Sequence, residues 1–172
     1  MNTSSSVIQL PERIADVEQL ETLMSTPSPA LVQTLSRVEG DIMVLGVGGK
    51  MGPTLARMAK LATPGRRVIG VARFSEPGLR ERLTAHGIEC IEADLLSRDA
   101  LRQLPDAPNI VFMAGRKFGS AGSEWLTWAM NAYLPALVAE RFPRSRIVAF
   151  STACVYPFVD VHGPGAAAGL AP

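Results

Sequence analysis

Residues 44–52, which read VLGVGGKMG, carry four glycines between a short apolar run and a helix-like stretch. Glycine weakens packing at such a place and costs backbone entropy on folding. A chain that accepts this cost needs a bare backbone at that corner. The pattern is typical of a strand-to-helix turn that a ligand or another part of the chain approaches closely.

The segments around this turn alternate between strand-like and helix-like patterns. Apolar runs predict strands over 41–47, 66–73, 88–95, 109–115 and 146–152, and amphipathic stretches predict helices over 53–62, 78–87, 97–104 and 124–142. This alternation favours a parallel sheet with helices on both faces. Right-handed crossovers and a reversal after the third strand give the order 3-2-1-4-5, the doubly wound α/β Rossmann fold. Two more helices, 12–24 and 29–38, precede the sheet.

Composition excludes several classes of protein. A net charge of +1 provides no electrostatic case for nucleic acid or an anionic membrane. No apolar run reaches about 18 residues, so we expect no membrane span. Cys90 and Cys154 show no framework spacing, which suits a reducing cytoplasm. Two histidines without ligand spacing predict no metal site.

The glycine spacing distinguishes two nucleotide-binding motifs. G-x-G-x-x-G would need glycine where Met51 stands, whereas G-x-x-G-x-x-G fits Gly46, Gly49 and Gly52. After a strand and before a helix, this motif predicts a pyrophosphate near the bare turn and the helix N-terminus. The alternative is a tight turn with close helix packing and no ligand.

Five short motifs follow one another in a recognisable order: GVGGKMG, ADL, FMAG, NAYLP and FSTACVY. From about residue 41 to 156 the chain resembles the NAD(P)-dependent epimerase/dehydratase family, the extended short-chain dehydrogenase/reductases. The resemblance implies an oxidoreductase that transfers hydride on a sugar nucleotide or a small carbonyl or alcohol. We expect an N-terminal extension over 1–38, a cofactor-binding domain over 39–158, and a Gly/Ala/Pro-rich tail over 159–172 before a substrate-binding part.

The end of the second strand bears on the choice between NAD and NADP. NAD-preferring folds place an acid about 20 residues after the glycines to hold the ribose 2′-hydroxyl. Here Ala72 and Arg73 occupy that position. No carboxylate would repel a 2′-phosphate and a guanidinium could bind one, so we expect NADP over NAD. The alternative is that Arg73 is merely solvated at a strand end.

The resemblance also implies further cofactor contacts. Asp94 and Leu95 would edge the adenine, although Asp94 could instead cap the following helix, for which Ser97 is the better candidate. Met113, Ala114 and Gly115 would run along the central ribose or simply pack, and Asn131 would hold a water or a backbone segment. Trp125, Trp128 and Tyr133 are expected in the core. The predicted cofactor site comprises Gly46, Gly48, Gly49, Lys50, Met51, Gly52, Ala72, Arg73, Asp94, Leu95, Met113, Ala114, Gly115 and Asn131.

For the chemistry, the resemblance points to Thr152, four places before Tyr156, as the hydroxyl that orients the substrate. The family's base is a Tyr followed four residues later by Lys, and no such pair occurs in this sequence. We therefore expect a chain that binds nucleotide but catalyses no hydride transfer alone. The alternative is a non-catalytic NADP-sensing module. A methyl-donor enzyme fits less well, because such enzymes usually carry an acid where Arg73 stands. The N-terminal helices could be an oligomer contact, which leaves a homodimer open.

Overall fold

A parallel five-stranded sheet forms the centre of the computed structural model, which describes residues 10–117, 121–152, 156, 158–160, 162, 163 and 165. The strands are β1 (Ile42–Leu45), β2 (Val68–Ala72), β3 (Glu89–Glu92), β4 (Asn109–Phe112) and β5 (Arg146–Ala149). Their order is β3-β2-β1-β4-β5, which confirms the predicted Rossmann topology. Each strand is shorter than the apolar run that predicts it. Cys154 and most of the predicted tail lie outside the described residues.

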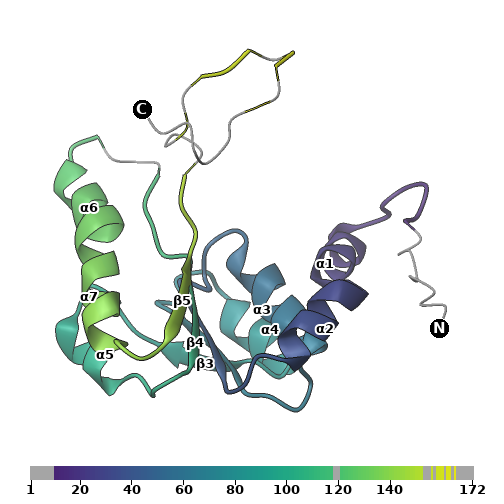
Figure 1. Cartoon of the computed structure of the whole chain (residues 1–172), viewed down its shortest axis with the longest axis horizontal. Coiled ribbons are helices and arrows are strands. Elements are labelled where there is room, and N and C mark those ends of the chain that lie inside the picture. Colours follow the sequence, from purple (N-terminus) through teal and green to yellow (C-terminus); the bar gives the residue numbers. More distant parts are fainter. Residues whose placement is uncertain are drawn as a thin grey trace.

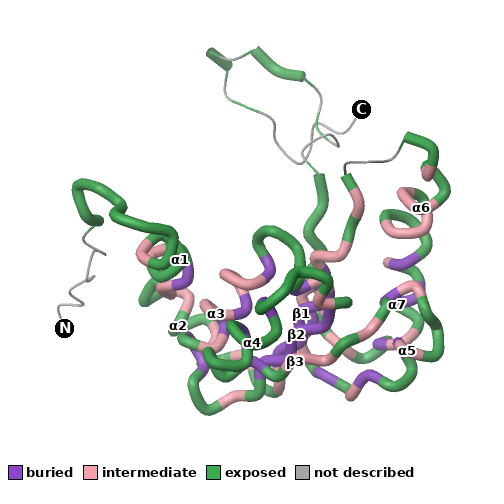
Figure 2. The backbone as a smooth tube through the Cα atoms, turned by 180° about the vertical axis from the view of Figure 1, so that it is seen from behind, coloured by how far each residue is buried: buried purple, intermediate pink, exposed green. Residues whose placement is uncertain are grey.

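Helices cover both faces of this sheet (Figure 1). On one side lie α3 (Gly52–Ala62) and α4 (Leu79–Ala85), and on the other lie α5 (Arg98–Gln103), α6 (Glu124–Trp128) and α7 (Leu134–Arg141). Each face has its own core: one cluster includes Met43, Leu45 and Leu134, and the other includes Val44, Val68 and Leu83. Figure 2 shows the buried residues gathered around β1 and β2.

The predicted long helix 124–142 is not continuous. A π-helical turn, Ala129–Tyr133, separates α6 from α7, and the Leu134 N–H bonds to the Ala129 carbonyl five residues back. The cause lies in the sequence: Pro135 has no N–H to donate to the carbonyl of Asn131, four residues earlier. The helical ladder shifts its register at this point, and π turns of this kind recur at functional sites.

The N-terminal helices are α1 (Val17–Ser25) and α2 (Pro29–Ser36), and both pack against α3. The first begins later than its periodicity predicts, because the Asp16 carboxylate accepts the Gln19 N–H at 2.8 Å and caps the helix there. Glu21 on α1 pairs with Arg57 on α3 at 3.6 Å. Most of the apolar face predicted for this helix stays open, since Val17 is 70% exposed. Among the described residues, every helix is too short or too polar to span a lipid bilayer.

Candidate functional site

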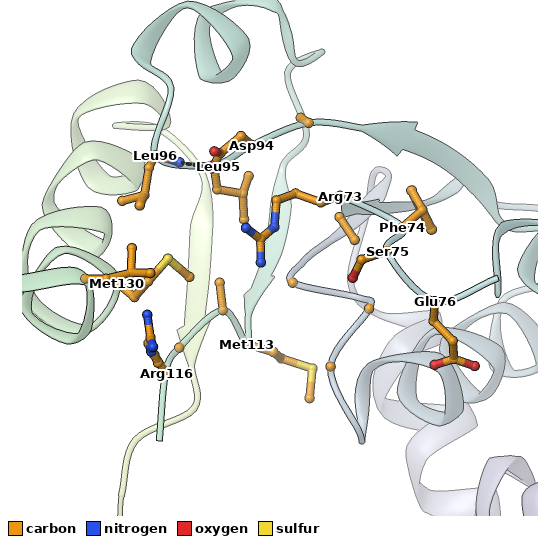
Figure 3. A pocket seen from close by; sticks show the side chains of 18 of the residues that line it. Arg73, Phe74, Ser75, Glu76, Asp94, Leu95, Leu96, Met113, Arg116 and Met130 are labelled. Atoms are coloured by element: carbon orange, nitrogen blue, oxygen red, sulfur yellow. Dashed lines mark hydrogen bonds between the residues drawn. The ribbon is translucent and has the colours of Figure 1, made fainter. Parts of the chain in front are cut away.

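A cleft of about 600 Å³ opens where the carboxyl ends of β1, β2, β3 and β4 meet. This is the edge of a doubly wound sheet at which ligands bind. Figure 3 shows side chains entering it from the segments after β2, β3 and β4 and from the π-helical turn. Its lining consists of Gly46, Gly48, Gly49, Ala72, Arg73, Phe74, Ser75, Glu76, Leu79, Ala93, Asp94, Leu95, Leu96, Met113, Ala114, Gly115, Arg116, Trp125, Leu126 and Met130.

Two glycines of the turn are required by the fold itself. Gly46 has a φ of +88°, and a Cβ added to it would lie 2.6 Å from the backbone nitrogen of Ala114. A Cβ on Gly52 would lie 2.3 Å from the carbonyl oxygen of Val47. Such contacts are far inside van der Waals distance. Gly46 and Gly52 therefore let β1, β4 and α3 approach one another, whatever occupies the cleft.

Gly49 has no such reason to lack a side chain. Its backbone lies outside the left-handed region, and the nearest atom to an added Cβ would be the Gly46 carbonyl oxygen at 3.4 Å, an ordinary contact. Gly49 nevertheless lines the cleft. The bare backbone at this position fits an occupant of the cleft that comes close to the turn.

The turn also carries unused hydrogen-bond donors. The N–H groups of Gly49 and Gly52 bond to the carbonyls of Gly46 and Gly49 at 3.0 and 3.1 Å. Within the described part of the chain, the N–H groups of Gly48, Lys50 and Met51 make no hydrogen bond. Donors at the start of a helix, beside its positive dipole end, suit the oxygens of a phosphate. The turn thus fits the pyrophosphate of a dinucleotide.

The segment that follows β2 brings charge into the cleft. Figure 3 shows the Arg73 guanidinium between the chain after β3 and Met113, and the Ser75 hydroxyl on the same side of the cleft. Phe74, between them, has a φ of 46°, a left-handed backbone that costs a non-glycine residue about 1–3 kcal/mol. The half-buried Phe74 packs against the core cluster of that face, which holds the backbone in this conformation. Arg73 and Ser75 are therefore the neighbours of a residue, Phe74, that the core holds in place.

The turn between β3 and α5 shows which residue caps the start of α5, Asp94 or Ser97. The Ser97 hydroxyl accepts the Ala100 N–H at 3.2 Å and caps α5, as the sequence favours. Asp94 instead accepts the N–H of Leu96 at 3.0 Å, which closes a tight turn at the cleft. Leu95 is buried beside it. This corner therefore presents one carboxylate and an apolar surface to the cleft.

Asn131 holds the chain that leaves β4. Its Oδ1 accepts the N–H of Arg116 at 2.8 Å, and its Nδ2 donates to the Arg116 carbonyl at 2.8 Å. The π-helical turn projects Asn131 toward this peptide and Met130 into the cleft. The Arg116 guanidinium also donates to the Ser123 hydroxyl at 2.8 Å. Together these bonds fix the wall of the cleft between β4 and α6.

The family follows from the sequence of this same region. The model of the NAD dependent epimerase/dehydratase family matches residues 42–168, most of the chain. The chain belongs to this family. No curated protein matches it significantly.

Solved structures of epimerases share the fold of this chain. The ADP-L-glycero-D-manno-heptose-6-epimerase of Helicobacter pylori is 20% identical, with a TM-score of 0.63 over 73% of this chain and 43% of that protein. The UDP-glucose-4-epimerase of Stenotrophomonas maltophila, solved with NAD and formylated UDP-arabinopyranose, is 18% identical, with a TM-score of 0.59 over 74% and 41%. The chain therefore spans less than half the length of these two relatives.

A third example is the UDP-glucuronic acid 4-epimerase of Bacillus cereus, solved in complex with NAD. It is 18% identical, with a TM-score of 0.53 over 70% of this chain and 42% of that protein. At such identities the likeness establishes the fold alone.

Ten of the predicted site residues line the cleft of this family member, namely Gly46, Gly48, Gly49, Ala72, Arg73, Asp94, Leu95, Met113, Ala114 and Gly115. Lys50, Met51, Gly52 and Asn131 lie outside the lining, although they adjoin it along the chain or through Arg116. Thr152 is exposed, three residues beyond the end of β5, and is likewise outside the lining.

Sequence reasoning missed the wall of the cleft that α6 and the π-helical turn form. Trp125, Leu126 and Met130 line it, whereas the helix pattern suggested that its aromatic residues belong to the core. That expectation was wrong: Trp125 and Trp128 are 70% and 73% exposed, and Tyr133 is also exposed. The apolar spacing could not distinguish a helix face that meets the core from one that borders a cleft. Ser75 and Glu76 were missed too, and their position directly after Arg73 was the available signal.

Hydrogen bonds lower the pKa of two carboxyl groups among the described residues, while burial raises the pKa of the Cys90 thiol on β3. Hydrogen bonds from the backbone N–H groups of Glu124 and Gly122 lower the pKa of the Glu124 carboxyl at the start of α6. At the opposite edge of the sheet, the hydrogen bond from Arg67 lowers the pKa of Glu89. The described residues contain no cluster of three His, Cys, Asp or Glu side chains placed to hold a metal ion.

Proposed function

We propose that the cleft binds NADP(H) and that the chain is the dinucleotide-binding part of an epimerase/dehydratase-type oxidoreductase. The observation that carries this proposal is Gly49, which lines the cleft and has no structural need to lack a side chain. When bound, the nicotinamide cofactor supplies the hydride acceptor or donor. The residues of this chain hold its pyrophosphate at Gly48–Met51 and its adenosine between Arg73 and Leu95.

The preference for NADP over NAD rests on Arg73 and Ser75. Both reach the cleft from the segment after β2, where NAD-preferring folds carry an acid. A guanidinium forms charge-assisted bonds to phosphate, and a hydroxyl donates one more. The neighbours solved with NAD show that the fold accepts that cofactor in those proteins. The charge beside the cleft supports NADP for this chain.

The substrate class follows by analogy with the relatives. One structural neighbour was solved with formylated UDP-arabinopyranose and another with UDP-glucuronic acid and NAD. We propose that the parent enzyme acts on a sugar nucleotide or a small carbonyl or alcohol, with Thr152 orienting the substrate. We keep the division into an extension over 1–38, a cofactor domain over 39–158 and a tail over 159–172 as part of this proposal.

One alternative keeps the cleft but removes the chemistry. A non-catalytic NADP-binding module is favoured by the absence of any Tyr-x-x-x-Lys pair from the sequence: Tyr133 is followed four places on by Leu137, and Tyr156 by Asp160. Such a module would bind the cofactor in the same cleft. The two functions differ only in whether a hydride is transferred.

The test of the binding site replaces Gly49 by Val. The branched side chain would occupy the space that a pyrophosphate needs, so we expect calorimetric binding of NADPH to fall below detection while the protein stays folded. Gly65→Val is the matched control, because Gly65 is exposed and nothing lies within 4 Å of an added Cβ. Binding by Gly49→Val as tight as by the control would place the dinucleotide elsewhere.

The test of cofactor choice replaces Arg73 by Ala. Loss of a charge-assisted bond should weaken NADPH binding by about 1.5–3 kcal/mol and leave NADH binding nearly unchanged. Arg102→Ala removes the same charge from α5, where Arg102 pairs with Asp99 away from the cleft, and should change neither affinity. An equal loss of both cofactors in Arg73→Ala would rule out the 2′-phosphate assignment.

A further inference from the structure

The rim of the cleft after β2 carries a carboxylate as well as Arg73. Glu76 stands three residues after Arg73 on the same segment, and both residues line the cleft. Figure 3 shows both side chains on this one segment, with the Arg73 guanidinium reaching into the cleft and the Glu76 carboxylate pointing to the other side. An unmatched carboxylate here would offset the charge of Arg73 and repel a phosphate bound beside it.

The Glu76 carboxylate is matched by a partner from outside the cleft. Its Oε1 accepts a hydrogen bond from the Arg82 Nη2 at 2.5 Å. Arg82 lies in the last turn of α4 and does not line the cleft. Gly78, with a φ of +77° at the N-cap of α4, turns the chain so that Glu76 and Arg82 meet. The Gly78 backbone leaves the Arg82 Nη1 only 3.4 Å from the position of an added Cβ.

The other charged groups near this rim have different partners. Arg80, two residues earlier on α4, reaches Glu92 at 3.4 Å and lies over the Phe74 ring at 5.9 Å from its centroid. Asp94 lines the opposite side of the cleft and accepts the Leu96 N–H. Arg82 is thus the cation that the structure pairs with Glu76.

We propose that Arg82 sets the preference of the cleft for a 2′-phosphate by neutralising Glu76. With the ion pair formed, the segment after β2 presents the charge of Arg73 to the phosphate. Without Arg82, Glu76 becomes an unpaired acid near the place where NAD-preferring folds carry theirs. Arg82 is therefore a positioning and charge-balancing residue, and this role rests on the proposed binding of NADP(H) in the cleft.

The experiment measures NADPH and NADH affinities for four full-length chains: wild type, Arg82→Gln, Glu76→Gln and the double variant. Arg82→Gln should weaken NADPH binding by about two- to fivefold at low ionic strength, because exposed charges interact only weakly through water. NADH binding should not change. Glu76→Gln and the double variant should bind NADPH at least as tightly as wild type, since the repelling carboxylate is gone.

Two further measurements separate this charge effect from a structural one. Arg82→Lys should restore NADPH binding, and the loss in Arg82→Gln should disappear at 1 M salt, where charges are screened beyond about 3 Å. Arg80→Gln, on the same helix but paired with Glu92, is the matched control and should retain the wild-type preference.

Two results would overturn the inference. One is an equal loss of NADPH and NADH in Arg82→Gln, and the other is a loss that persists in the double variant. Failure of the proposed function looks different, because wild type itself would then bind neither cofactor, or Arg73→Ala would leave NADPH binding intact.

Discussion

Strands β1 and β5 are both short apolar runs in the same sheet, yet they differ in how far their residues are buried. β1 pairs with β2 and β4, and all four of its residues are buried. β5 pairs with β4 on one side, and Val148 is 62% exposed. The register places Val44, Val111 and Val148 in one row across the sheet, so two equivalent valines differ only in what covers them.

This difference separates the two halves of the proposed site. The half beside β1 is enclosed by the chain's own residues: the glycine turn, the segment after β2 and the π-helical turn form a defined cleft. The half beyond β5 holds Thr152 and Tyr156, both exposed, outside that cleft. The proposed cofactor site therefore rests on a cleft formed by described residues, whereas the proposed chemistry rests on residues outside that cleft.

The largest expected effect concerns catalysis. We expect the 172-residue chain to catalyse no measurable hydride transfer with NADP and a panel of nucleotide sugars and small alcohols, followed by the absorbance of the reduced cofactor. Losing a general base typically costs 10²–10⁴-fold in rate, and poor substrate positioning costs more. Turnover that disappears in Tyr156→Phe would show that Tyr156 is the base and that the half beyond β5 is complete.

The next effect compares the two valines directly. Val44→Ala should lower the free energy of unfolding by about 1.5–3 kcal/mol, because the side chain is fully buried. Val148→Ala should change it by about 0.5 kcal/mol or less, since the side chain is mostly in water. Urea denaturation of both variants measures the difference. Equal losses would mean that β5 is covered in solution, for example in an oligomer.

The smallest effect concerns the β3 edge. The Arg67 side chain donates two hydrogen bonds of 2.6 Å to the Glu89 carboxylate. These bonds are the main cause of the lowered pKa of Glu89. A lowered folded-state pKa stabilises the protein above the usual value of 4.5, and that contribution is lost as the pH falls through the folded-state value. Glu89→Gln should therefore be less stable than wild type at pH 7, and the gap should narrow as the pH falls below 4.5. A gap that is independent of pH would assign the loss to packing.

Local sequence patterns predicted the features that depend on the physical preference of a single residue type. The alternation of apolar runs and helix patterns predicts the order of the sheet, and Ser97 is correctly favoured over Asp94 as the cap of α5. The glycine spacing predicts the turn, but it does not reveal that Gly46 and Gly52 serve the fold while Gly49 faces the cleft. That distinction depends on Ala114 and Val47, whose positions follow from how β4 and α3 pack.

Periodicity and short-range spacing were enough to predict the doubly wound fold, its glycine turn and the arginine after β2, because these depend on residues near one another in the chain. The burial of apolar faces depends on packing, since Val17, Trp125 and Val148 carry the same local pattern as core residues and yet lie exposed. The pairing of Glu76 with Arg82 and of Asn131 with the Arg116 peptide also depends on packing, because side chains find such partners only after helices and strands have packed. Burial and pairing are properties of the neighbours in space, and the chain order does not specify them.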